Sequence, residues 1–141
     1  MINFRLEANN VDEVLTDLAS KIQGALEAVG NQAVSHAKSN ITSAGRVDTG
    51  AMRNSISHMV EENTCYVGTN IEYAIYHEYG TGIYTDGGGG RQTPWFYVDA
   101  KGEGHFTHGM KPIHFLKDAL GDHLDEYRSI IEQILKEQTS E

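Results

Sequence analysis

Residues 11–41, VDEVLTDLASKIQGALEAVGNQAVSHAKSNI, do most to determine the fold class. Apolar residues recur in this stretch at steps of three and four, which is the spacing of one face of an α-helix. The stripe consists of Val11, Leu15, Leu18, Ile22, Ala25, Val29, Ala33 and Ala37. Asn10 and Glu13 have the spacing of an N-terminal capping box, so the helix is predicted to begin near Asn10 and to continue to about Ile41.

Two features of this predicted helix bear on its shape and its contacts. Gly24 and Gly30 each cost about 1 kcal/mol relative to alanine inside a helix, so a kink is expected near Gly30 and Asn31. The apolar stripe is also longer than the rest of one small domain can easily cover. Part of it is therefore expected to face a neighbouring subunit.

Two short runs rich in β-branched and aromatic residues follow the polar loop of residues 43–50. Residues 55–60 and residues 64–68 are separated by a polar turn, and together they predict an antiparallel hairpin. Residues 71–79 are predicted to form a short helix, because Gly80 directly after them is the residue expected past a helix end.

The second half of the chain predicts one more hairpin and a final helix. Residues 94–98 and 104–108 flank a glycine-containing turn and are expected to extend the same sheet. Residues 81–93 contain four consecutive glycines and are expected to be mobile. Pro112 is predicted to open the last helix, which should end near Lys136. Its apolar stripe consists of Leu116, Leu120, Leu124, Tyr127, Ile131 and Ile134.

These elements predict an α+β domain, in which a mostly antiparallel sheet of two hairpins is covered by a long N-terminal helix and a C-terminal helix. The length favours one domain over residues 1–141, with a flexible loop at about residues 81–93 and loosely ordered termini.

The composition argues against several classes of protein. No segment approaches the roughly 18 consecutive apolar residues that a membrane span requires. The net charge of −9 argues against sequence-independent binding of DNA or RNA, because such binding depends on Lys and Arg that neutralise phosphates. The single cysteine, Cys65, cannot form an intramolecular disulfide, and its apolar surroundings in the sequence favour a buried structural thiol.

Three patterns resemble catalytic or binding motifs only weakly. Asp48-Thr49-Gly50 is the tripeptide of aspartic proteases, but here it follows a long predicted helix and a polar run instead of an apolar strand. Gly87 to Arg91 lacks the lysine and hydroxyl residue of a phosphate-binding loop. Among the 7 histidines no arrangement fits a catalytic triad on a strand-to-helix elbow. No catalytic, cofactor-binding or metal-binding residues are predicted.

His105, His108 and His114 lie close together in the sequence, with Asp99 and Glu103 nearby, and imidazoles with carboxylates bind zinc. The spacing does not match a zinc signature, and on a strand His105 and His108 would point to opposite faces. A metal-dependent hydrolase built on these three histidines is therefore an alternative function, and a small protein-binding module is another.

The order of motifs along the chain is more specific than any one of them. Residues 47–50 read VDTG and are followed by Arg53, and residues 73–82 read YAIYHEYGTG. After the glycine run come Trp95-Phe96-Tyr97 and the Pro112-x-x-Phe115-Leu116 pattern. In this order and over roughly residues 10–135, the chain resembles the tail-component family of long-tailed bacteriophages and prophages, which comprises tail-completion or head-tail joining proteins. His77 and His114 depart from the family pattern.

The resemblance implies a structural virion protein without enzymatic activity or cofactor. It implies that copies of the chain assemble into a ring, a hexamer, at the head-proximal end of the tail. The implied partners are a neck or head-completion protein and a tail terminator or tail-tube protein, with no specific nucleic acid and no membrane. The implied location is the head-tail junction of the virion, and the host cytoplasm during assembly.

The same resemblance suggests roles for individual residues. Asp48-Thr49-Gly50 would form a turn that presents the hairpin, and Arg53 could pair with Glu78 as a buried or interface ion pair. Gly80 would supply the positive φ needed to leave the short helix. The structural and interface candidates are Asp48, Thr49, Gly50, Arg53, Tyr73, Glu78, Gly80, Thr81, Gly82, Trp95, Phe96, Pro112 and Phe115.

Two hypotheses concern assembly. Residues 81–93, beside Trp95 and Phe96, are expected to act as a docking segment that becomes ordered on assembly. The net charge, repeated in every copy around a ring, would keep passing DNA from adhering to the wall by like-charge repulsion.

Overall fold

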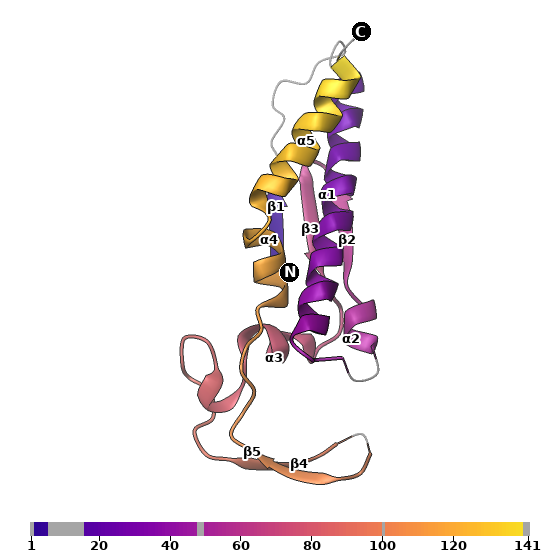
Figure 1. Cartoon of the computed structure of the whole chain (residues 1–141). Helices are drawn as coiled ribbons and strands as arrows, with labels where there is room; N and C mark the ends of the chain where they lie inside the picture. The colour runs from indigo at the N-terminus through magenta and orange to yellow at the C-terminus, as the bar shows by residue number, and fades with distance from the viewer. Residues whose placement is uncertain (1, 6–15, 48–49, 100, 140–141) are drawn as a thin grey trace.

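The computed structural model describes residues 2–5, 16–47, 50–99 and 101–139. It confirms the α+β class, with a long N-terminal helix, two antiparallel hairpins and C-terminal helices that pack on the first helix. Figure 1 shows an elongated body of helices and sheet, from one end of which a β-hairpin projects. The predicted capping residues Asn10 and Glu13 lie outside the described residues.

The sheet of the body has three antiparallel strands in the order β1-β3-β2. Strands β2 (Ser57–Glu61) and β3 (Thr64–Gly68) form the first predicted hairpin, which is confirmed, and β1 (Ile2–Arg5) pairs with the other edge of β3. Strand β1 was not predicted, although Ile2, Asn3, Phe4 and Arg5 alternate between apolar and polar, which is the period of a half-buried strand. A short helix, α2 (Ala51–Asn54), leads into β2 and was also missed.

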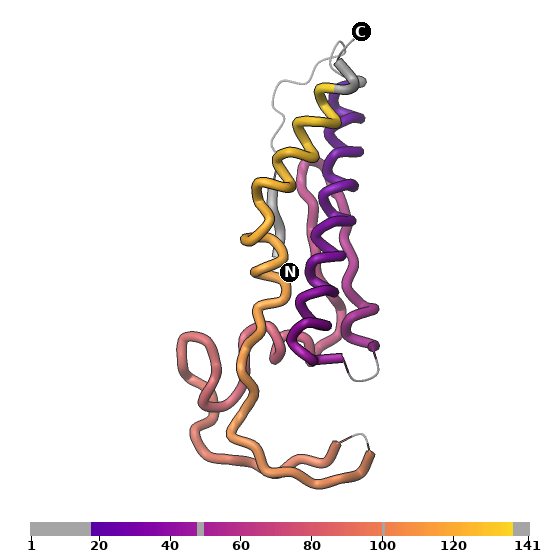
Figure 2. Tube along the Cα trace, viewed as in Figure 1, coloured from indigo at the N-terminus to yellow at the C-terminus, as the bar shows by residue number. Residues whose placement is uncertain are grey.

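The second hairpin does not extend this sheet. Strands β4 (Trp95–Val98) and β5 (Gly104–Thr107) form their own two-stranded sheet, so the prediction of a single sheet of two hairpins is wrong in this respect. Figure 2 shows the chain leaving the body after α3 (Ala74–Tyr79), forming the hairpin, and returning to the body before α4 (Phe115–Gly121). We call residues 81–111 the arm.

Helix α1 (Thr16–Ser43) lies between the sheet and the C-terminal helices and contributes most of the core. The predicted stripe is confirmed where it is described, since Ile22, Ala25, Val29, Ala33 and Ala37 are buried. The sheet, α4 and α5 (Leu124–Thr139) cover this stripe within one chain. For these residues the expectation of a face left for a neighbouring subunit is wrong, because the C-terminal helices occupy it.

Helix α1 is one continuous helix, so the expected kink at Gly30 is absent. Gly30 is buried against the sheet, and a Cβ built on it would lie 2.4 Å from Cδ2 of His58 and 3.0 Å from Sγ of Cys65. The missing side chain therefore permits close approach of helix and sheet. Burial also raises the pKa of the Cys65 thiol to about 11, with Glu27 adding to the effect, so the expected buried structural thiol is confirmed.

The two glycines of α1 should respond oppositely to alanine. Gly24 is exposed, and a Cβ added to it would have no atom within 4 Å, so Gly24→Ala should raise the free energy of unfolding by about 0.5–1 kcal/mol through helix propensity. Gly30→Ala should lower it by about 1–3 kcal/mol, because His58 and Cys65 must move. Urea denaturation of both variants tests this, and stabilisation by Gly30→Ala would contradict the packing described.

The predicted C-terminal helix is two helices. It begins at Phe115 instead of Pro112, because His114 takes a positive φ of 50° just before it, and it is interrupted between Gly121 and Leu124. Leu124, predicted to lie on the apolar stripe, is 46% exposed as a result. The described part of the chain contains no helix that is both long enough and apolar enough to cross a membrane.

Candidate assembly surface

Helix α3 has two different faces. Ala74 and Glu78, one turn apart, are buried against the body, whereas Ile75, Tyr76 and Tyr79 are each about half exposed. Gly80 ends the helix with a φ of 81°, as predicted. The helix therefore presents an aromatic and aliphatic face to solvent at the end of the body from which the arm leaves.

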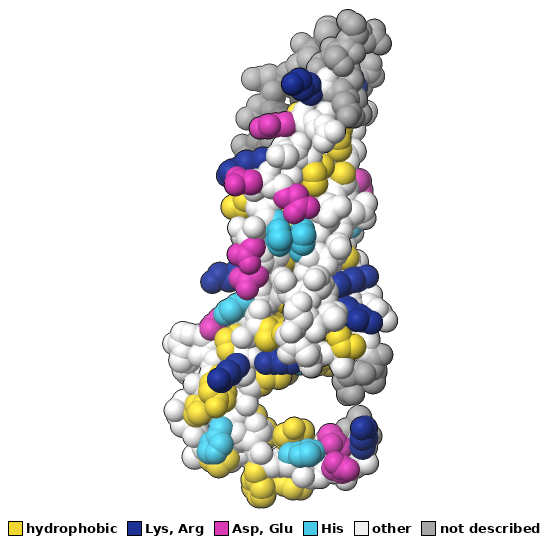
Figure 3. All heavy atoms as spheres, in the orientation of Figure 1, with side chains coloured by type: hydrophobic (Ala, Val, Ile, Leu, Met, Phe, Trp, Pro, Cys, Tyr) yellow, Lys and Arg dark blue, Asp and Glu magenta, His cyan; other side chains and the backbone are white. Residues whose placement is uncertain are grey.

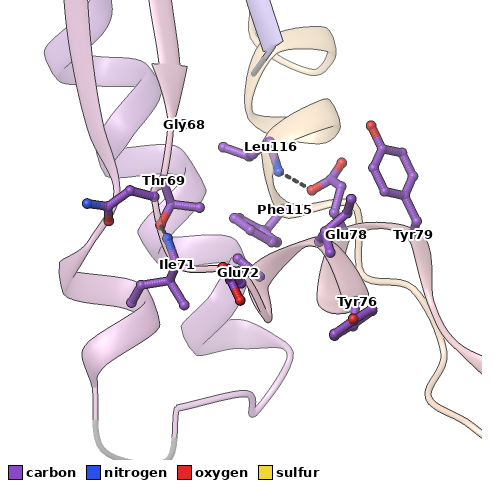
Figure 4. A pocket seen from close by; sticks show the side chains of 12 residues that line it. Gly68, Thr69, Ile71, Glu72, Tyr76, Glu78, Tyr79, Phe115 and Leu116 are labelled. Atoms are coloured by element: carbon purple, nitrogen blue, oxygen red, sulfur yellow. Dashed lines mark hydrogen bonds between the residues drawn. The ribbon is translucent and has the colours of Figure 1, made fainter.

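Glu78 holds α3 against α4. Glu78 is 3% exposed, and its Oε1 accepts the backbone N–H of Leu116 at 2.8 Å (Figure 4). Its Oε2 accepts the backbone N–H of Lys117 at 3.1 Å. A carboxylate in this position satisfies two of the free amides of the first turn of α4 and interacts favourably with the positive end of the helix dipole.

The expected ion pair between Arg53 and Glu78 is not formed. Glu78 is occupied by the α4 amides, and Arg53 Nη1 donates to Oγ1 of Thr42 at 3.3 Å. The sequence contains no direct signal for the actual partners of Glu78, because they are backbone groups 38 and 39 residues away.

A surface pocket of about 600 Å³ lies beside α3. Its wall joins the end of β3, the exposed face of α3 and the first turn of α4, as the side chains in Figure 4 show. The residues that line it are Gly68, Thr69, Asn70, Ile71, Glu72, Ala74, Ile75, Tyr76, Glu78, Tyr79, Phe115 and Leu116.

A polar cluster fixes the opposite side of α3. Arg46 donates to Nδ1 of His77 at 3.1 Å and to the carbonyl of Lys111 at 2.8 Å. Burial and the nearby guanidinium lower the pKa of His77, which keeps Nδ1 available as an acceptor. The carbonyl of His77 also accepts the N–H of Ile113 at 2.9 Å. His77 thus ties α3 to the loop after α1 through Arg46, and to the segment before α4 through Ile113.

The two legs of the arm are hydrogen-bonded to each other. The N–H of Thr81 donates to Met110 O at 2.9 Å, and the N–H of Ile83 donates to His108 O at 3.0 Å. Oγ1 of Thr81 accepts the N–H of Met110 at 2.9 Å. A 3₁₀ turn, η2 (Gly82–Tyr84), lies in this region, so the base of the arm is structured although a loop was predicted over 81–93. Mobility of the remaining residues of that loop stays a prediction.

The hairpin at the end of the arm carries aromatic residues on both faces. Phe96 and Phe106 face each other across the strands with ring centroids 5.4 Å apart, and they are 57% and 79% exposed. On the other face, Tyr97 stacks on His105, while Arg91 lies over Trp95. Figure 3 shows hydrophobic side chains gathered on the arm and an opening between the arm and the body. In water a two-stranded hairpin is at best marginally stable alone, so this one needs further contacts.

Asp99 organises the tip of the hairpin. Its Oδ1 accepts the backbone N–H groups of Lys101 and Glu103, both at 2.9 Å, and its Oδ2 lies 2.8 Å from Nε2 of His105. These hydrogen bonds, that from His105 first, lower the pKa of the Asp99 carboxyl. The turn is therefore held by its own side chains.

The three histidines of the hydrolase alternative do not gather in one place. His105 lies with Asp99 and Glu103 at the hairpin tip, whereas Nε2 of His114 lies 3.2 Å from Oδ2 of Asp86. Within the described residues, neither His108 nor His114 joins a group of possible metal ligands. A different group, formed by His36, His123 and Glu126, has no signature in the sequence and was not predicted.

The predicted interface residues that the structure describes fall into three groups. Glu78 and Phe115 line the pocket beside α3, and Gly50, Arg53 and Tyr73 line a second pocket of about 380 Å³ with Arg46 and His77. The others lie on the arm or where it joins the body: Gly80, Thr81, Gly82, Trp95, Phe96 and Pro112. Asp48 and Thr49, with the turn predicted for them, lie outside the described residues.

The model of a family described as "Bacteriophage HK97-gp10, putative tail-component" matches residues 8–80. The match covers more than half of the 141 residues, from before α1 to the end of α3. The chain belongs to this family. No match was found among curated proteins or among solved structures.

As a bacteriophage tail component, the chain is a structural protein of the virion and not an enzyme. Asp48-Thr49-Gly50 lies within the matched region, so the family gives no support to its weak resemblance to a protease motif. The matched region also includes the exposed face of α3 and most of the pocket beside it, whereas the arm follows directly after the match.

Proposed function

We propose that this tail component completes the tail at the head-tail junction by assembling into a ring, with six copies as the expected number. A neck or head-completion protein on one side and a tail terminator or tail-tube protein on the other are the expected partners. The observation that carries the proposal is the arm, whose hairpin exposes aromatic residues on both faces without cover from its own chain.

The arm and the pocket beside α3 form a suitable pair of contact surfaces. Contiguous exposed apolar surface is characteristic of protein-protein interfaces, and aromatic residues are enriched in them. The arm and the pocket are different surfaces of one chain, so contact between them in successive copies is heterologous, and such contacts generate rings when the rotation closes. We infer that the arm of one copy reaches the α3 region of the next.

The acidic charge is consistent with a passage for DNA. A net charge of −9 in each subunit would repel duplex DNA wherever it lines a lumen. Filter binding with the assembled ring at moderate salt should therefore detect no retention of duplex DNA. Retention would contradict electrostatic repulsion between the ring and the DNA.

Phe106→Asp should abolish assembly while leaving the subunit folded. The Phe106 side chain is 79% exposed in the single chain and packs across the strands against Phe96, so the substitution should lower the free energy of unfolding by no more than about 1 kcal/mol. At an interface it would place a charge in an apolar contact, which is expected to prevent ring formation. Native mass spectrometry of the protein and electron microscopy of particles from a prophage carrying the variant provide the measurements. Unjoined heads and tails are expected.

Leu124→Asp is the matched control. Leu124 is also a large exposed hydrophobic residue, 46% exposed, but it lies at the start of α5 away from the arm, where an aspartate is favourable. Joining should be normal with Leu124→Asp. Normal joining with Phe106→Asp, or equal failure of both variants, would overturn the role proposed for the arm.

A further inference from the structure

Three possible metal ligands meet on the body, outside the arm. His36 comes from α1, His123 from the interruption between α4 and α5, and Glu126 from the first turn of α5. The two imidazole rings are stacked, with centroids 3.5 Å apart and planes inclined by 4°. Oε2 of Glu126 lies 2.8 Å from Nε2 of His36 and 3.4 Å from Nδ1 of His123.

The separations of the three ligand atoms are compatible with one shared transition-metal ion. All three lie within 4.8 Å of one another. In a tetrahedral zinc site with bonds of about 2.0–2.1 Å, donor atoms lie roughly 3.4 Å apart. The two measured distances of 2.8 and 3.4 Å are already at or below that separation. The donor atoms are therefore close enough to share one ion after the imidazole rings reorient.

The ligand chemistry and the exposure also fit. Two imidazoles and one carboxylate suit Zn²⁺ and neighbouring divalent transition metals better than Mg²⁺ or Ca²⁺. The side chains of His36, His123 and Glu126 are 25%, 31% and 38% exposed, so an ion can enter from solvent. The net charge of −9 favours the approach of a cation.

We propose that His36, His123 and Glu126 bind one divalent transition-metal ion, with Zn²⁺ as the preferred ligand and water completing the coordination. For both nitrogen lone pairs to reach one ion, the stacked rings must open from their parallel arrangement by rotation of the imidazoles. The ion would link α1 to the start of α5, and so stabilise the packing of the C-terminal helix on the N-terminal one.

A second group, Asp99, Glu103 and His105 at the hairpin tip, is a weaker candidate. It offers a single imidazole, and Asp99 already accepts hydrogen bonds from Lys101 and Glu103 through one oxygen and contacts His105 through the other. In contrast, the contacts of Glu126 in the first group are with the two imidazoles themselves. The hairpin group therefore provides an internal control.

The experiment is a titration of the tag-free, EDTA-treated full chain with Zn²⁺ by calorimetry, and with Co²⁺ by absorption spectroscopy. The wild-type protein should bind one ion per chain, and Zn²⁺ should raise the melting temperature. His36→Asn and His123→Asn should each weaken binding by at least about tenfold, whereas His105→Asn should leave it unchanged.

Circular dichroism and urea denaturation in EDTA establish that each variant is folded, and Glu126→Gln, which keeps the side-chain volume, replaces any histidine variant that is not. Loss of binding in His36→Asn, His123→Asn or Glu126→Gln with retention in His105→Asn supports the site. Absence of saturable binding by the wild type, or loss of binding in His105→Asn alone, overturns it. None of these readouts depends on ring assembly, so the outcome is independent of the proposed function.

Discussion

Glu78→Ala is expected to lower the free energy of unfolding by about 3 kcal/mol. The substitution removes a buried carboxylate and leaves the N–H groups of Leu116 and Lys117 without their acceptor. An unsatisfied buried polar group costs about 1–3 kcal/mol, and the cavity left by the side chain adds to this cost. The loss would be a large share of the stability of a small domain. Urea denaturation followed by circular dichroism measures it.

Two further variants separate the explanations for this effect. Glu78→Gln keeps the volume and one acceptor oxygen, so it should lose about half as much stability as Glu78→Ala. Glu72→Ala removes an exposed glutamate just before α3 and should change stability by no more than about 0.5 kcal/mol. If Glu78→Ala and Glu72→Ala lowered the free energy of unfolding by the same small amount, the Glu78 carboxylate would not be the group that joins α3 to α4.

Gly82→Ala is expected to disconnect the arm and so to abolish ring assembly. A Cβ on Gly82 would lie 1.9 Å from the carbonyl oxygen of His108, which is the acceptor of the N–H of Ile83. The residue also has a φ of 61°, which costs an alanine about 1–3 kcal/mol. The legs of the arm must therefore separate. Hydrogen exchange at Thr81, Ile83 and Met110 should accelerate at least about tenfold, and native mass spectrometry should detect only single chains.

Gly87→Ala is the matched control, because it shares the positive φ but not the clash. Its φ is 75°, and a Cβ added at this position would have no atom within 4 Å. It should leave exchange at the base of the arm unchanged and permit assembly. Normal assembly by Gly82→Ala would mean that the pairing of the legs is not required, and the contact between arm and pocket would then need a different geometry.

Helices α1 and α3 and the first hairpin could be predicted because their signals are local. The α1 stripe repeats over many turns, β2 and β3 are separated by a short turn, and Gly80 ends α3. The second hairpin was also recognised, but not its separation from the sheet. Pairing between distant strands depends on which edge of β3 is free, and β1 occupies the edge that β2 leaves open.

The site was harder to predict because its contacts join residues distant in sequence. Glu78 and Phe115 were both named as candidates, yet the partners of Glu78 are amides of α4, which have no side-chain signature. His36 and His123 come together only because the C-terminal helices fold back along α1. The interruption after Gly121, which places His123 there, breaks the helical period on which the prediction rested.

The attachment of the arm determines how it can move. Its two legs leave the body at Gly80 and Pro112, which lie so close together that a Cβ on Gly80 would be 2.9 Å from Cδ of Pro112. Glu78, just before the first leg, binds the helix that follows the second. A force on the arm is therefore transmitted to α3 and α4 together, because Glu78 connects the two helices. In an assembled particle, tilting the arm would turn this end of the subunit as one piece.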